Sequence, residues 1–128
     1  MIRENISSRL YDLNMTQRTL SNTTGIEYTA INTFLNGHKG IWFERAQSCL
    51  DVVGLSAVGT YKSDTPLSIQ KSCWMEIRSK KINVRETAKT LNIGYCTLTN
   101  FLHGRIGMSI DKVERLMSFL GIKLVPCD

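Results

Sequence analysis

The chain has 128 residues, of which 42% are hydrophobic and 21% are charged, and its net charge is +5. These proportions are typical of a folded globular protein, and no apolar run is long enough to cross a bilayer or resembles a signal peptide. We therefore expect a cytoplasmic protein with no membrane partner. The four cysteines are scattered without metal-ligand spacing, which favours free thiols and predicts neither a metal nor another cofactor.

The first half of the chain predicts four short helices. Thr16 is a suitable N-cap for the second helix, and Gly25 is expected to end it. Asn36 and Gly37 should stop the third helix, and Gly54 should close the fourth. The inward-facing apolar side chains of these helices recur at helical spacing: Ile2, Ile6, Leu10, Leu13, Leu20, Ile31, Phe34, Leu35, Phe43, Ala46, Leu50 and Val53.

A polar, turn-rich stretch at residues 56–66 predicts a linker to a second set of helices. Residues 65–66 (Thr-Pro) are expected to start the next helix, because proline at the first helical position loses no hydrogen bond. Asn83 and Glu86 resemble a capping box for the helix after it. The tail contains a short β-prone run, residues 122–125, which is compatible with a small strand.

The two halves repeat each other at an offset of 67 residues without a gap. The stretch TGIEYTAINTFLNGHKG returns as LNIGYCTLTNFLHGRIG. A repeat of this length corresponds to a whole small domain, which is longer than a typical solenoid unit. We therefore predict an all-α protein with two tandem domains of about four to five short helices each, at residues 1–55 and 67–128.

The positive charge is unevenly distributed between the repeats. Residues 1–55 contain five basic and five acidic side chains, whereas residues 68–128 contain ten basic and five acidic ones. The surplus in the second repeat favours a polyanionic partner.

Two helices joined by a tight turn, the second of which ends at a glycine, are the pattern of a helix-turn-helix. Ile26 and Ile93 would fill the angle between the helices, and Ser21 and Ala88 would allow a close crossing. The outer faces of the third helices, at about residues 27–36 and 94–103, are polar enough to meet base edges in a major groove.

The stretches TQRTLSNTTGIEYTAINTFLNG and, less closely, NVRETAKTLNIGYCTLTNFLHG resemble the DNA-binding domains of phage lambda repressor and Cro, the XRE-type helix-turn-helix family. The resemblance covers about residues 2–55 and 68–122. It implies a transcriptional regulator of phage or mobile-element type, with operator DNA as partner, in a bacterial nucleoid or a phage-infected host cell. Most members of that family act as homodimers.

The resemblance also implies roles for individual residues. In the first repeat Gln17 would contact a phosphate and brace Tyr28, while Asn36 and Lys39 would hold the DNA backbone. In the second repeat Val84 replaces the glutamine, so basic side chains would have to substitute for it. The full set of predicted DNA-binding residues is Gln17, Arg18, Tyr28, Thr29, Asn32, Thr33, Asn36, Lys39, Arg85, Lys89, Tyr95, Cys96, Thr97, Thr99, Asn100, His103 and Arg105.

Two alternatives to a simple DNA-binding homodimer follow from the sequence. One chain with two modules could imitate a two-fold dimer, and its dissimilar reading faces would then require dissimilar half-sites. The other alternative is a protein-interaction module on the same scaffold, such as an antitoxin, an anti-repressor or an inhibitor, in which only one repeat or neither repeat reads DNA. An enzyme is not expected, because no nucleophile–base pair, carboxylate pair or phosphate-binding glycine loop is recognisable.

Overall fold

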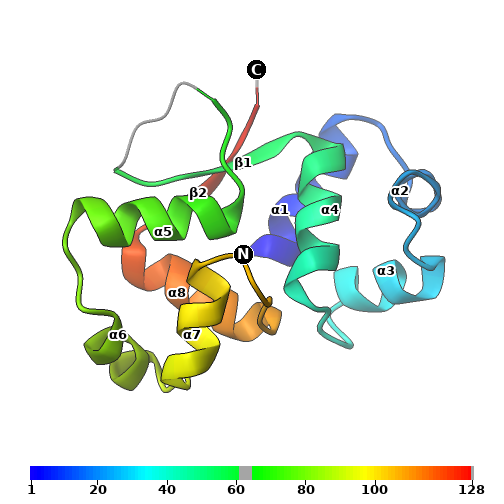
Figure 1. Ribbon diagram of the computed structural model, residues 1–128. Helices are drawn as coiled ribbons and strands as arrows, with labels where there is room; N and C mark the ends of the chain where they lie inside the picture. Colours follow the sequence, from blue (N-terminus) through cyan, green and yellow to red (C-terminus); the bar gives the residue numbers. More distant parts are fainter. Residues whose placement is uncertain (61–64, 128) are drawn as a thin grey trace.

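The computed structural model describes residues 1–60 and 65–127, and these residues form eight helices and one two-stranded antiparallel sheet (Figure 1). The protein is thus mostly helical, as predicted, with a small β-ribbon added. No helix within the described residues combines the length and apolar character that a membrane span needs. The elements are α1 Ile2–Asp12, α2 Gln17–Thr24, α3 Tyr28–Leu35, α4 Phe43–Val53, β1 Leu55–Val58, α5 Ile69–Ser79, α6 Val84–Leu91, α7 Tyr95–Leu102, α8 Ile110–Leu120 and β2 Lys123–Pro126.

The helices repeat along the chain as the sequence does. Each of α1 to α4 has the same bounds as one of α5 to α8 after addition of 67 residues. The ends of the helices are set by local signals. Gly25 ends α2 in the left-handed conformation (φ 77°), and its counterpart Asn92 ends α6 in the same conformation (φ 55°), which asparagine tolerates better than most residues.

The predicted start of α5 at residues 65–66 is wrong. The helix begins at Ile69, because the side chain of Ser68 caps it by accepting a hydrogen bond from the backbone N–H of Lys71 at 3.2 Å. The predicted caps Thr16 and Asn83 do accept such bonds.

The segment predicted as a linker contains a strand. β1 occupies residues 55–58 and pairs with β2 near the C-terminus, where the sequence had indicated a β-prone run. Leu55, Ser56 and Ala57 of β1 are themselves buried. Residues 61–64 of the predicted linker lie outside the described part of the chain.

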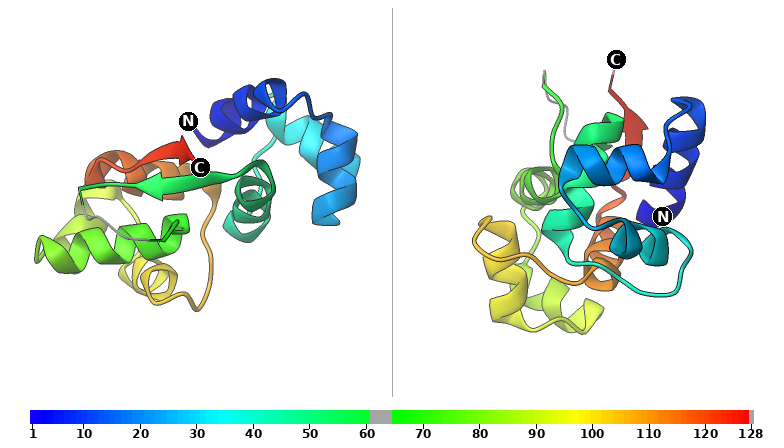
Figure 2. Two further views of the ribbon diagram at one scale, coloured as in Figure 1. Left: turned by 90° about the horizontal axis from the view of Figure 1, so that it is seen from above. Right: turned by 90° about the vertical axis from the view of Figure 1, so that its right-hand side faces the viewer.

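The two halves share one hydrophobic core. Their buried side chains form a single cluster, and α4 of the first half packs against α8 of the second. At the junction the rings of Phe43 and Phe101 meet edge to face at 4.9 Å. Figure 2 shows the helices of the two halves gathered on opposite sides. The repeats are therefore packed together as one body.

Candidate nucleic-acid interface

The corner between α2 and α3 is built the same way as the corner between α6 and α7. In each case a residue in the left-handed conformation is followed by a buried isoleucine, Ile26 or Ile93. The hydroxyl of Ser21 donates to the carbonyl oxygen of Ile26, which ties α2 to the turn. Its counterpart Ala88 is small and buried, so the helices can cross closely there as well.

The predicted recognition helices α3 and α7 are held from behind by the first helix of their own repeat. Arg3 donates to the carbonyl oxygen of Phe34, and its guanidinium lies 4.8 Å from the centre of that ring. At the equivalent place Gln70 donates to the carbonyl oxygen of Leu102 at 2.6 Å. The last turn of each helix, whose carbonyls lack partners within the helix, is therefore fixed to the core.

An arginine–tyrosine pair stands at the start of both recognition helices. The guanidinium carbon of Arg18 lies 4.4 Å from the ring centre of Tyr28, and that of Arg85 lies 4.3 Å from the ring centre of Tyr95. The tyrosines are 37% and 40% exposed, and both arginines are exposed. An arginine held over a ring keeps its charge and its N–H donors available for an anion such as a phosphate.

In the first repeat three side-chain amides form a chain along the outer face. Asn32 donates through Nδ2 to Oε1 of Gln17 at 2.9 Å, and Asn36 donates through Nδ2 to Oδ1 of Asn32 at 3.3 Å. The hydrogen bond found for Gln17 thus goes to Asn32, and it is Arg18 that contacts Tyr28. A chain of fixed amides offers both donors and acceptors in set positions, which is what discrimination between base edges requires.

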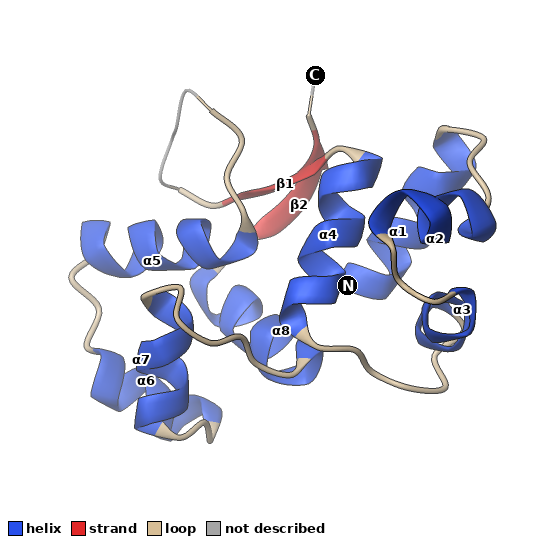
Figure 3. Cartoon of the chain, turned by 45° about the vertical axis from the view of Figure 1, so that its right-hand side comes forward, coloured by secondary structure: helices blue, strands red, loops and turns tan. Residues whose placement is uncertain are grey.

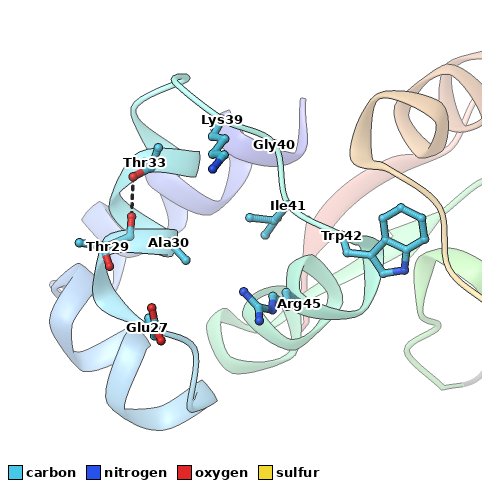
Figure 4. Close-up of a pocket in the computed structure, with 9 residues that line it drawn as sticks. All are labelled: Glu27, Thr29, Ala30, Thr33, Lys39, Gly40, Ile41, Trp42 and Arg45. Carbon is cyan, nitrogen blue, oxygen red and sulfur yellow. Dashed lines mark hydrogen bonds between the residues drawn. The ribbon is translucent and has the colours of Figure 1, made fainter.

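The remaining predicted residues of the first repeat lie on the same side. Thr29 is exposed on α3, and the Thr33 hydroxyl donates to its carbonyl oxygen at 2.6 Å. Thr29 and Thr33 line a groove together with Lys39 and Arg45 (Figure 4). Figure 4 shows Lys39 on the loop after α3 and Arg45 on α4. Arg45 was not among the predicted residues, although its match with Lys112 in the second repeat could have indicated it.

In the second repeat the amide chain is missing. Val84, Thr99 and His103 take the places of Gln17, Asn32 and Asn36 in the alignment. The Oγ1 atom of Thr99 is buried and has no hydrogen-bond partner among the described residues. Thr99 itself is half-buried, but its hydroxyl is covered, and the apolar Val84 cannot pair with it.

The second repeat has basic side chains on α6 and after α7. Arg85, Lys89 and Tyr95 line a common hollow beside the turn, and Arg105 is exposed after α7. His103 lies at the C-terminal end of α7 against the indole of Trp74, with the ring centres 4.9 Å apart. The other predicted residues lie on α7, where Cys96 is exposed and Thr97 and Asn100 are half-buried.

Two of the cysteine thiols are poor nucleophiles in the folded protein. Burial raises the pKa of the Cys49 thiol to about 11, and burial together with the nearby carboxylate of Glu76 raises the pKa of Cys73 further. Cys96 is exposed. No cluster of histidine, cysteine and acidic residues able to hold a metal ion occurs in residues 1–60 and 65–127.

A scan against protein-family models, a search of curated proteins and a search of solved structures each found no match. The functional assignment therefore rests on the residues and the geometry of this chain.

Proposed function

We propose that the protein is a sequence-specific double-stranded DNA-binding regulator of transcription, and that α2–α3 and α6–α7 are helix-turn-helix units. The observation that carries this proposal is the duplicated arginine–tyrosine pair. The Arg18–Tyr28 and Arg85–Tyr95 pairs recur at the first turn of each recognition helix with nearly the same separation. Among the exposed positions of these two faces, the tyrosine is the one that the repeats share.

The surroundings of the pair support a phosphate-rich partner. When a recognition helix lies in a major groove, the helix before it crosses the sugar-phosphate backbone, so Arg18 on α2 and Arg85 on α6 would meet phosphates. Further cations lie close to the recognition helices, since Lys39 and Arg45 line the groove beside α3 and Lys89 lines the hollow beside α7. The outer faces of α3 and α7 carry short polar side chains that are able to hydrogen-bond to base edges.

Repression is the simplest outcome of such binding. A compact protein that occupies a promoter excludes the polymerase without any further contact, and we therefore propose a repressor.

Selection of bound duplexes from a random DNA pool tests the proposal, followed by measurement of affinity against salt concentration. We expect one enriched motif and a steep loss of affinity with salt, because phosphate contacts release counterions. Arg18→Ala should weaken binding about 10- to 100-fold, as the loss of a charge-assisted hydrogen bond does. Lys123→Ala is the matched control, since it also removes one exposed positive charge but lies on the β-ribbon.

Recovery of no motif, together with no binding at low salt, would overturn the proposal. Co-purification of a specific protein with the intact chain would then support the interaction-module alternative.

A further inference from the structure

The β-ribbon is paired about a local two-fold axis. In its register Ala57 lies opposite Leu124, and these two residues are equivalents at the 67-residue offset. Trp42 and Ser109, which form an isolated antiparallel bridge, are equivalents as well. A residue that pairs antiparallel with its own equivalent marks a two-fold axis between the copies. The axis therefore passes through the ribbon and through the bridge before α4 and α8.

Two hydrogen bonds between the halves obey the same symmetry. The backbone N–H of Ile2 donates to Oε2 of Glu114 at 2.9 Å, and the N–H of Ile69 donates to Oε1 of Gln47 at 3.0 Å. Ile69 is the equivalent of Ile2, and Gln47 is the equivalent of Glu114. The first helix of each repeat is thus held at its N-terminal end by a side chain from the fourth helix of the other repeat, and the two side chains occupy equivalent positions. This reciprocity is the mark of a two-fold interface.

Both recognition helices lie towards one end of this axis. Figures 1 and 3 show α3 and α7 on opposite sides of the molecule, and both lie below the ribbon in these views. One surface of a single chain therefore presents two related helices, as a two-fold dimer presents one helix from each subunit.

The two repeats are related by the two-fold axis, but the outer faces of their recognition helices, α3 and α7, carry different side chains. In the first repeat, the amides of Gln17, Asn32 and Asn36 are linked and oriented. In the second repeat the equivalent Thr99 hydroxyl is buried, and the surplus of positive charge belongs to this repeat, with Arg85, Lys89 and Arg105 exposed on or near α6 and α7. Oriented amides distinguish bases, whereas positive charge contacts phosphates of any sequence.

We infer that one copy of this chain occupies a whole operator of two half-sites, and that it reads bases in only one of them. This inference rests on the proposed DNA-binding function. The half-site under α3 is read through the amide chain of Gln17, Asn32 and Asn36. The half-site under α7 is held through its phosphates, by Arg85, Lys89 and Arg105.

The test begins with a duplex selected from the random pool and with the stoichiometry of its complex by native mass spectrometry. We expect one chain per duplex. Each base pair of the site is then substituted in turn. Substitutions in one half should weaken binding about 5- to 150-fold, the usual range for a mismatched position. In the other half they should change affinity within about twofold, while phosphate ethylation should interfere in both halves.

Two matched variants assign the halves to the helices. Asn32→Ala should flatten the base preference of the sensitive half, and Thr99→Ala, at the equivalent position, should leave the preference of both halves unchanged. The double substitution Val84→Gln with Thr99→Asn installs the missing amide pair, and it should create base preference in the insensitive half.

The outcomes separate this inference from the proposed function. Two chains on a symmetric site, or base preference of equal size in both halves, would overturn the inference while leaving DNA binding intact. Absence of binding to any duplex would instead overturn the proposed function on which the inference rests.

Discussion

Substitution of Phe101 by leucine should destabilise both halves of the chain together. Phe101 belongs to the second repeat and is 1% exposed, and its ring packs edge to face with that of Phe43 from the first repeat. The substitution removes an aromatic pair across the junction of the two repeats. Because the halves share one core, we expect them to unfold in one cooperative transition.

The size of the effect follows from the contact and the burial. An edge-to-face pair contributes about 0.5–1.5 kcal/mol beyond the burial of its area. Incomplete filling of the site by leucine adds to this loss, which brings the total to about 2 kcal/mol. For an m-value of about 2 kcal/mol per molar urea, the midpoint of unfolding should fall by about 1 M. A double-mutant cycle with Phe43→Leu should return a coupling energy of about 0.5–1.5 kcal/mol.

The chain provides a fluorescent probe in each half, Trp42 in the first and Trp74 in the second. In the Trp42→Phe variant the remaining Trp74 reports the second half, and in the Trp74→Phe variant the remaining Trp42 reports the first half. Urea titrations of both variants, each with and without Phe101→Leu, therefore follow the unfolding of the two halves separately. Lys89→Ala serves as the control, because Lys89 is exposed and its loss should move neither midpoint. A midpoint that falls for Trp74 but stays fixed for Trp42 would refute the shared core.

Three further outcomes are expected. The pair of substitutions Arg18→Ala and Arg85→Ala should lower the slope of log affinity against log salt by about 2, one for each lost phosphate contact, and an unchanged slope would place these arginines away from DNA. Bound DNA should slow maleimide labelling of the exposed Cys96 on α7 and leave labelling of Cys127 beside the ribbon unaffected; equal protection of both would contradict the placement of the interface. Because the pKa of Cys49 is raised from 9.0 to about 11, the unfolded chain loses that proton first, so the free energy of unfolding should fall between about pH 9 and pH 11. Cys49→Ala should reduce this fall in urea titrations, and an identical pH dependence in the variant would contradict the shifted pKa.

Local signals made most of the helices predictable from the sequence. Thr16, Gly25 and Gly54 set helix ends through their own backbone and side-chain chemistry, and the structure has them at those ends. The start of α5 was mispredicted because the side-chain cap of Ser68 outweighed the proline signal at residues 65–66. The ribbon was harder to foresee, because β1 is short and its partner lies almost 70 residues away in the chain.

Contacts between the repeats could not be predicted from the sequence. Gly40 and Gly107 match in the alignment, yet a side chain at Gly40 would meet open space. At Gly107 a β-carbon would lie 2.5 Å from the carboxylate of Glu44, which accepts a hydrogen bond from the Gly107 N–H. In the candidate site, the family resemblance predicted a contact of Gln17 with Tyr28, and the contacts of Arg18 with Tyr28 and of Arg85 with Tyr95 were not predicted, although these residues match at the 67-residue offset. The bond from Asn32 to Gln17 and the buried hydroxyl of Thr99 depend on how the helices cross, which sequence periodicity does not specify.

Site-directed DNA cleavage would test most directly whether one chain places two unlike helices on one operator. Two proteins are prepared, both with Cys127→Ser. In the first, a cleavage reagent is attached to Cys96 on α7. In the second, which also has Cys96→Ser, the reagent is attached on α3 through the substitution Thr29→Cys. Each protein is then bound to the selected duplex. We expect two cuts about one helical turn apart, with the cut from α3 in the base-sensitive half and the cut from α7 in the other half. Equal cutting of both halves by each protein, or no cutting from Cys96, would contradict the account.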